Sequence, residues 1–444
     1  MPPTPDATAP GAAVPDRGRA DACPGALRLH TADDGGLARV RLPGGLLTDR
    51  QALALVEAAE ALGDGELETT SRGNVQLRGL AADCGAELAD RLRAVGLLPS
   101  DTHERVRNIV ASPLAGLDAA GNADVQAWVR ELDARLCASD WAAGLSGKFL
   151  FALDDGRGDV AALDADVTLI AAPDGPALLR LGRAARGRPV EAGREVTAVL
   201  DAARAFLDAL RSGGRKAWHL REVPELLPPG TVPLPAFAGA AAVPVGVLPA
   251  AGALPAVGVL PAVGALPGGL SVGMRFGRAD AGQWRALVAA STGELRLTPW
   301  RGAVLPGAPA DRLPALAAAG LRTEPGSAWE RATACTGLPG CAKSLADVRA
   351  DAARALERAA SEAGASEAGA LEAGGGALPV HWSGCERRCG HPAGQWVDVL
   401  ATGHGYRVTV NGPATTAGTP AGVPVDVTNE EMAEAVAEAR RTTK

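Results

Sequence analysis

Four cysteines in two close pairs are the residues whose types and spacing point most directly to chemistry. Cys335 and Cys341 stand in ACTGLPGC, and Cys385 and Cys389 follow in SGCERRC, 44 residues beyond Cys341. Four thiolates from two loops can bind either zinc or a 4Fe-4S cluster. Structural zinc usually takes pairs separated by two to four residues, so the five residues inside the first pair favour the cluster. On spacing alone, zinc remains the alternative.

The residues around these cysteines agree with a cluster. Three glycines flank the pairs and would let the backbone approach inorganic sulfide closely: Gly337, Gly340 and Gly384. After Cys341, apolar residues recur at helical spacing: Leu345, Val348, Ala352 and Leu356. This stripe predicts a helix that begins at the cluster, where its N-terminal dipole would stabilise anionic thiolates.

The remaining cysteines and two histidines carry weaker signals. Cys23, Cys84 and Cys137 have no partners nearby in the sequence, and we assign them no function because free cysteines are commonly small buried hydrophobes. His381 and His391 flank the second pair. Each could donate a hydrogen bond to a thiolate or contact a substrate, and each could equally cap a loop.

A basic set forms a second constellation. It comprises Arg72 and Arg78 in TTSRGNVQLRG, Arg105 and Arg107 in HERVRNIVASPLAG, and Lys148 in LSGKFLF. An arginine fork pairs with a carboxylate at two points, whereas lysine offers a mobile point charge. Each residue alone could be a solvated surface charge, and spacing alone does not make the set a site.

An internal repeat indicates which elements position these residues. ELETTSRGNVQL at 66–77 aligns without gaps with ELRLTPWRGAVL at 294–305. A helical pattern precedes each copy, and a strand, a short polar break and another strand follow. In the first copy an opening strand near 38–42 and a helix near 84–95 complete a ferredoxin-like split unit. Two such units could pair across a pseudo-two-fold axis, and each precedes a longer mixed α/β stretch.

The chain of 444 residues is too long for one ordinary domain, and its composition suggests the boundaries. We predict an α+β fold with a disordered leader at 1–24 and ferredoxin-like half-domains at 25–98 and 270–326. Mixed α/β domains follow the half-domains at 99–227 and 327–444. A Pro/Ala/Gly-rich linker at 228–269 joins the halves, and the biased stretch 361–376 is expected to be a surface insertion.

Composition and charge exclude several functional classes. Hydrophobic residues make up 47% and charged residues 21%, which is typical of a globular protein. A net charge of -7 without a basic block argues against nucleic-acid or anionic-membrane partners. The N-terminal segment has no apolar run typical of a signal peptide, so we expect a cytoplasmic protein whose thiols stay reduced.

Four motifs together resemble the siroheme-dependent nitrite/sulfite reductase superfamily, and within it the precorrin-3B synthase family. They are TTSRGNVQLRG, RNIVASPLAG, ACTGLPGCAKSLADVRADA and HWSGCERRCGHP, and they span 69–392. The resemblance implies paired ferredoxin-like half-domains, a tetrapyrrole-binding domain at 99–227 and a 4Fe-4S domain at 327–444. It also places Arg72, Arg107 and Lys148 where the reductases contact a small anion or the macrocycle.

Two departures shape the functional expectation. Leu150 stands where the reductases have a second basic or polar residue, which weakens a reading as a sulfite reductase. Glu386, Arg387 and Arg388 replace the smaller residues usual inside the last cysteine pair.

The resemblance implies an oxygen-dependent monooxygenase that hydroxylates precorrin-3A and forms a lactone from a ring acetate. Its partners would be the precorrin substrate, dioxygen, and a ferredoxin or an NAD(P)H-linked reductase as electron donor. A separate mononuclear iron is an option without assigned ligands, because no two-histidine, one-carboxylate spacing is legible. One alternative is a sulfite or nitrite reductase with bound siroheme. Another is a non-catalytic electron carrier or tetrapyrrole-binding protein.

Overall fold

A computed structural model of the chain describes residues 21, 23–223, 225, 230–234, 263–325, 327, 329–365, 378–392, 394–411 and 424–441. The described residues form four β-sheets with helices packed on them, which confirms the predicted α+β class. Most of the predicted leader, the middle of the linker and residues 366–376 of the insertion lie outside the described residues. Within the described part, no helix is long and apolar enough to cross a membrane.

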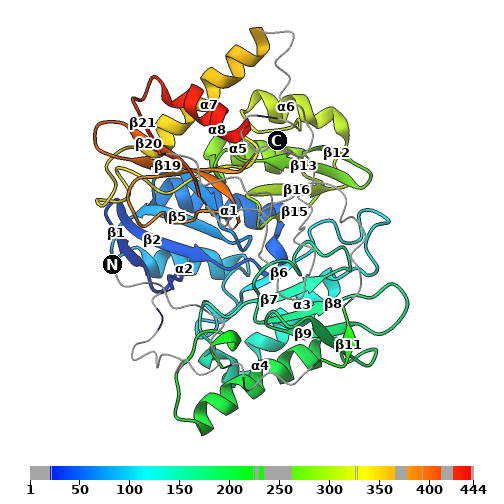
Figure 1. The fold of residues 1–444 in the computed structure, drawn as a ribbon. Coiled ribbons are helices and arrows are strands. Elements are labelled where there is room, and N and C mark those ends of the chain that lie inside the picture. Colours follow the sequence, from blue (N-terminus) through cyan, green and yellow to red (C-terminus); the bar gives the residue numbers. More distant parts are fainter. Residues whose placement is uncertain are drawn as a thin grey trace.

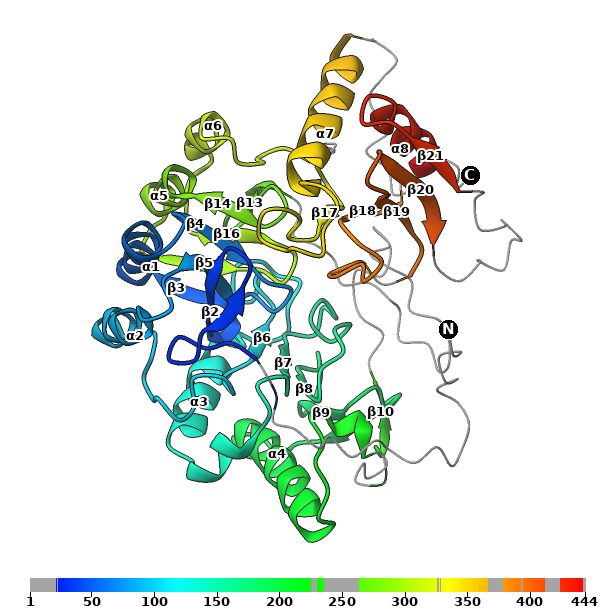
Figure 2. The same ribbon diagram turned by 90° about the vertical axis from the view of Figure 1, so that its left-hand side faces the viewer.

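The two half-domains form one five-stranded sheet each (Figures 1 and 2). In spatial order, the first sheet contains β1 (His30–Ala32), β2 (Gly35–Val40), β5 (Val75–Leu80), β4 (Glu66–Thr69) and β14 (Arg278–Asp280). The second contains β12 (Gly264–Leu266), β13 (Gly269–Gly273), β16 (Gly302–Pro306), β15 (Glu294–Leu297) and β3 (Leu46–Thr48). Each sheet therefore takes its last strand from the other half-domain.

This exchange of strands is symmetric, and local sequence explains it. The exchanged strand β3 runs directly into α1 (Asp49–Leu62), and β14 runs directly into α5 (Ala281–Ala290). Both helices begin with a capping box, formed by Thr48 with Gln51 and by Asp280 with Gln283. Helices α2 (Gly85–Ala94) and α6 (Leu313–Ala318) complete the two units. The predicted pairing of two ferredoxin-like units about a pseudo-two-fold axis is confirmed.

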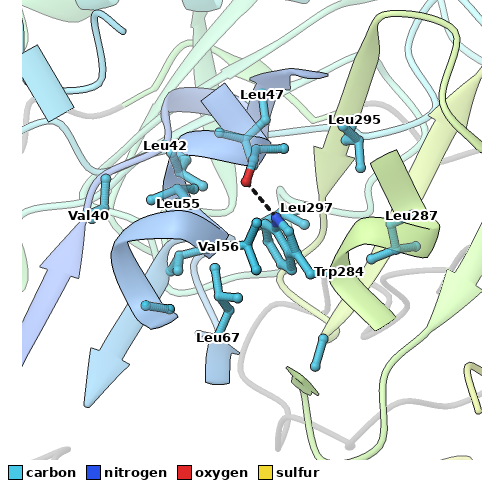
Figure 3. Packing of buried hydrophobic residues seen from close by; sticks show 14 of the residues in the cluster. Val40, Leu42, Leu47, Leu55, Val56, Leu67, Trp284, Leu287, Leu295 and Leu297 are labelled. Carbon is cyan, nitrogen blue, oxygen red and sulfur yellow. Dashed lines mark hydrogen bonds between the residues drawn. The ribbon is translucent and has the colours of Figure 1, made fainter. Parts of the chain in front are cut away.

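Helices α1 and α5 close a single core that both half-domains share (Figure 3). Trp284 is fully buried, and its Nε1 donates to the Ala52 carbonyl oxygen across the pseudo-axis at 2.8 Å. Side chains alternate along the strands, so one face of each sheet packs on the helices. Leu67, Val75 and Leu77 belong to this core, which leaves the polar residues between them for the opposite face.

The two longer α/β domains repeat the same topology (Figure 2). In the third sheet β6 (Ile109–Ala111), β7 (Phe151–Asp154) and β8 (Val167–Ile170) are parallel, and β9 (Leu178–Leu181), β10 (Arg186–Pro189) and β11 (Val232–Pro233) continue antiparallel. In the fourth sheet β17 (Ala332–Ala334), β18 (Val380–Ser383) and β19 (Trp396–Ala401) are parallel, followed by β20 (Tyr406–Asn411) and β21 (Val425–Val427). The matching helices are α3 (Gln126–Cys137) and α4 (Glu195–Ser212), and α7 (Val348–Ala365) and α8 (Met432–Arg441).

Several predicted boundaries need correction. Asp21 and Cys23 fall inside the predicted disordered leader but are buried against the folded chain. Strands β11 and β12 lie within the predicted linker at 228–269, so its ends belong to the sheets. Helix α7 starts at Val348 rather than at the cluster and extends into the predicted insertion at 361–376. Leu345 therefore precedes the helix and is 55% exposed, instead of joining the apolar stripe.

Candidate functional site

The four predicted cysteines lie in two loops at one edge of the fourth sheet. Cys335 directly follows β17, and Cys385 follows β18 by two residues. The ends of neighbouring parallel strands meet at the same sheet edge, so the two loops come together. Two backbone hydrogen bonds join the segments: Cys335 N donates to Trp382 O at 2.9 Å, and Leu345 N donates to Gly384 O at 2.8 Å.

The donor set at these loops fits an iron-sulfur cluster. Gly384 N donates to Cys335 Sγ at 3.2 Å, and a Cβ on Gly384 would collide with Ser344 Oγ. Burial raises the pKa of the Cys335 thiol, while the amides of Gly384 and Gly337 favour its thiolate. Four thiolates from two adjacent loops, one of them accepting from a backbone amide, are a donor set that suits a 4Fe-4S cluster.

The polar face of the first sheet covers these loops. Arg39, Gln76 and Glu68 stand on one rung across β2, β5 and β4 and therefore share a face. Two residues further along β5, Arg78 pairs with Asp34 at 2.7 Å. Arg78 Nη2 also donates to the carbonyl oxygen of Gly340, in the first cysteine loop, at 3.1 Å.

A second link to the cysteine loops runs through α7. Arg349 donates from Nε to the Cys335 carbonyl oxygen at 3.1 Å. Its Nη2 pairs with Glu68, on β4, at 2.8 Å. Arg349 therefore connects the Cys335 loop to the same sheet face that carries Arg39.

Three arginines gather on this face without enough carboxylates to neutralise them. We call Arg39, Arg41 and Arg72 the arginine cluster. Arg41 is 2% exposed, and its Nη1 and Nη2 have no hydrogen-bond partner within the described part of the chain. Burial and the charges of Arg39 and Arg72 together lower the pKa of Arg41 to about 9. Burying like charges is costly unless an anion pairs with them, so this arrangement is typical of an anion-binding site.

Segments from the first α/β domain flank the arginine cluster. Asp21 accepts hydrogen bonds from Gly147 N at 2.6 Å and Ser146 Oγ at 2.8 Å, and Arg105 lies 3.8 Å from its carboxylate. The adjoining Lys148 places its Nζ 3.9 Å from the centre of the Trp218 ring. Arg105, whose carbonyl oxygen accepts from Arg41 Nε at 3.3 Å, supplies further positive charge beside the arginine cluster.

The structure brings three of the five predicted basic residues to the arginine cluster or to the cysteine loops. Arg72 belongs to the arginine cluster, the carbonyl oxygen of Arg105 accepts from Arg41 Nε at 3.3 Å, and Arg78 contacts the first cysteine loop. Lys148 lies against Trp218. Arg107 points instead toward α3, where it pairs with Asp133 at 2.6 Å and donates to Leu97 O at 3.0 Å. Its Nε, Nη1 and Nη2 each donate a hydrogen bond there, and the substrate contact by Arg107 stays a prediction.

Leu150 lies in apolar surroundings. Its side chain is buried in a small apolar cluster with Val110, Ala152, Val160 and Ala165. Its backbone N–H donates to Asp166 at 2.8 Å. This position therefore offers no group that could contact a small anion.

Sequence reasoning missed Arg39 and Arg41, although a signal for them exists. They alternate with apolar residues in RVRLPGG, a pattern that places both on one strand face.

His381 is the other buried polar group near the cysteines. It is fully buried, and its Nδ1 lies 2.8 Å from Thr333 Oγ1. Burial, Arg301 and His391 lower the pKa of His381 to about 3, so its ring is neutral at physiological pH. His391 stacks on Trp396 with ring centres 5.2 Å apart. His391 Nδ1 lies 2.8 Å from the carbonyl oxygen of Pro392, in its own loop, and the roles of both histidines stay predictions.

Comparison with known proteins agrees with this geometry. Residues 30–95 and 267–321 match the nitrite/sulfite reductase ferredoxin-like half domain. A precorrin-3B synthase from Sinorhizobium sp is 28% identical over 89% of this chain and 84% of its own length. A ferredoxin–nitrite reductase from Synechococcus elongatus is 38% identical, but over 27% of this chain and 25% of that protein.

Solved structures show the same fold. The NirA protein of Mycobacterium tuberculosis superimposes with a TM-score of 0.64 at 20% identity, covering 90% of this chain and 79% of its own. The resemblance expected from the motifs and the predicted nitrite/sulfite reductase-like architecture are both confirmed.

Proposed function

We propose that this protein is a precorrin-3B synthase-like monooxygenase that converts precorrin-3A to precorrin-3B in the cytoplasm. The observation that carries the proposal is the arginine cluster beside the four-cysteine loops, in a chain similar to a precorrin-3B synthase over 89% of its length. A precorrin carries several carboxylates, which the buried guanidinium groups would pair at two points each.

The four cysteines would hold a 4Fe-4S cluster, which supplies single electrons when bound. Arg39, Arg41 and Arg72 would bind and orient the substrate carboxylates, and Arg105 and Lys148 would neutralise others at the rim. Arg349 would position the cysteine loop against the sheet by holding both the Cys335 carbonyl and Glu68. A macrocycle held by these arginines would therefore lie near the cysteine loops.

The reaction balances with an external electron donor. Dioxygen, two electrons and two protons would give one hydroxyl group on the substrate and one water. The electrons would come from a ferredoxin or an NAD(P)H-linked reductase, and a separate mononuclear iron stays without assigned ligands.

A siroheme-dependent sulfite or nitrite reductase is the second candidate, supported by the half-domain match and by the nitrite reductase relatives. Leu150 favours the oxygenase, because its side chain lies in an apolar cluster and leaves one fewer polar contact for a small oxyanion. A protein that only carries electrons does not need the arginine cluster, because it binds no anionic substrate.

The spectrum of the purified protein separates the two catalytic readings. When it is produced in cells that also make siroheme, the protein should show broad sulfur-to-iron absorption and no sharp Soret band. The reason is that an oxygenase must keep its tetrapyrrole-binding site free for the substrate. Stoichiometric siroheme together with sulfite- or nitrite-dependent electron consumption would contradict the oxygenase and establish the reductase.

A further inference from the structure

One cavity reaches from the arginine cluster to the second cysteine loop. It has a volume of about 480 Å³. Ser71, the neighbour of Arg72, lines one part of it, and Gly390, the residue after Cys389, lines another. A substrate held by the arginine cluster would extend into this cavity, so residues in the cavity wall are placed to act on the substrate.

Asp159 is the most deeply buried carboxylic acid in this wall. It is 1% exposed and belongs to the loop that follows β7 in the first α/β domain. The repeated topology makes this loop the counterpart of the loop after β18, which carries Cys385 and Cys389. The two counterpart loops therefore reach the same cavity from the two α/β domains.

Three buried carboxylates lie close together in the loop after β7. One oxygen atom each of Asp154, Asp155 and Asp159 lies within 4.8 Å of the other two, and each residue is at most 1% exposed. Like charges this close in a buried site cannot all ionise. The carboxyl with the weakest stabilisation of its charged form therefore keeps its proton.

Asp154 and Asp155 have strong partners for their charged forms. Arg157 donates to Asp155 from Nε at 2.9 Å and from Nη2 at 2.7 Å. Asp154 accepts hydrogen bonds from three backbone amides of its own loop at 2.7 to 2.9 Å. Asp154 also acts on the buried Arg180 of β9, whose pKa its charge raises. Both carboxylates are therefore stabilised by groups that do not contact Asp159.

Asp159 has weaker support for a negative charge. Its Oδ1 accepts hydrogen bonds from Ser112 Oγ at 2.6 Å and from Val160 N at 2.7 Å. Within the described part of the chain, no group donates to its Oδ2. Burial and the charges of Asp154 and Asp155 raise the pKa of Asp159 well above its usual range, which favours the protonated carboxyl. Because Oδ1 already accepts twice, Oδ2 carries the proton.

The other charged groups around the cavity leave this assignment in place. Arg157 pairs with Asp118, in the loop after β6, at 2.8 Å, and Arg183 pairs with Asp164 at 2.8 Å. Val160, the next residue, packs in the apolar cluster with Leu150 and brings no charge. The cations that line the opposite part of the cavity come from the second half-domain and the loops after it: Arg301, Arg322 and Arg331.

We infer that Asp159 is the proton donor of the reaction in this cavity. The inference rests on the proposed function, in which dioxygen takes up two electrons and two protons, one oxygen atom enters the substrate and the other leaves as water. The O–H bond of Asp159 breaks, and its proton ends on the oxygen atom that leaves as water. The carboxylate regains a proton from solvent after the product leaves. A buried acid that is protonated before the reaction suits this transfer.

Asp159→Asn in the cluster-loaded full-length protein tests the inference. Asparagine keeps the size of the side chain and an oxygen that accepts from Ser112 and Val160, but it has no acidic proton. We expect the yield of hydroxylated precorrin per dioxygen consumed to fall roughly a hundred-fold or more, with hydrogen peroxide released instead. Affinity for precorrin-3A should change less than about three-fold. Asp208→Asn, on the exposed face of α4, is the matched control and should keep the wild-type yield.

Ser112→Ala gives a readout that a purely structural role of Asp159 would not move. The Ser112 hydroxyl stabilises the Asp159 carboxylate, so its removal raises the pKa of Asp159 further. Product formation needs the protonated acid, so in the wild type it is complete below the pKa of Asp159 and is lost as the pH rises through it. This alkaline limb should move to higher pH in Ser112→Ala and be absent in Asp159→Asn.

The infrared C=O stretch of a protonated carboxyl adds a measurement that needs no turnover. At neutral pH the wild type should show this band and Asp159→Asn should lack it. A yield of folded Asp159→Asn within about three-fold of wild type, the absence of this band, or an alkaline limb that Ser112→Ala does not move would each overturn the inference. A wild type that reduces nitrite or sulfite instead of hydroxylating precorrin-3A would overturn the proposed function alone. The same variants are then compared on that reduction, which also consumes protons.

Discussion

Cys385→Ser protein is expected to purify with its iron and acid-labile sulfide largely lost, against about four of each per chain in the anaerobic wild type. The thiolate is the ligand that the cluster needs, and a serine hydroxyl is a poor substitute. Cys335, Cys341 and Cys389 should behave in the same way, since each would hold a different iron. Metal analysis and a sulfide assay measure the effect directly.

Cys137→Ser is the matched control, because Cys137 is half-buried at the end of α3, away from the two loops. It should keep wild-type iron and sulfide. Stoichiometric zinc without sulfide in the wild type would contradict the cluster assignment. Equal loss of iron in Cys137→Ser would show that the assay reports unfolding rather than ligation.

Arg41→Met is expected to weaken binding of a carboxylated tetrapyrrole to the arginine cluster by roughly ten- to a hundred-fold, as for a charged hydrogen bond worth about 1.5 to 3 kcal/mol. The same change should leave the free energy of unfolding unchanged or raise it by about 1 kcal/mol, because it replaces a buried, unpartnered charge by an apolar side chain. If Arg41 served only stability, its replacement would lower the free energy of unfolding and leave tetrapyrrole binding unchanged.

Arg211→Met serves as the control for that substitution. Arg211 is an exposed arginine at the end of α4 that pairs with Asp208 at 2.8 Å, and exposed pairs contribute little. Arg211→Met should therefore change neither the affinity for the tetrapyrrole nor the free energy of unfolding measurably. Denaturant unfolding gives the free energy of unfolding of both variants, and equilibrium binding gives their affinity for the tetrapyrrole. A lower free energy of unfolding of Arg41→Met with unchanged affinity would show that Arg41 is not part of the binding site.

Much of this fold could be predicted from particular residues. The ungapped repeat at 66–77 and 294–305 indicated two similar units, and the cysteine spacing located the loops that meet at one sheet edge. The exchange of β3 and β14 could not be predicted, because each strand has only three residues and therefore shows no periodicity. The extended chain before each capping box reads equally well as a loop.

The site was predicted less completely, for physical reasons. Arg107 lies just before a buried strand, and its direction depends on Asp133, which is distant in the sequence. The burial of Asp21 and Cys23 depends on the loop at Ser146, which composition does not reveal.

Incorporation of labelled dioxygen into the product tests the central claim most directly. Protein reduced in the presence of precorrin-3A and exposed to ¹⁸O₂ should yield a hydroxylated tetrapyrrole that carries one labelled oxygen atom by mass spectrometry, and no product should form without dioxygen or without reductant. Product that takes its oxygen from water, or precorrin-3A left unchanged by a protein that reduces sulfite or nitrite, would contradict the account.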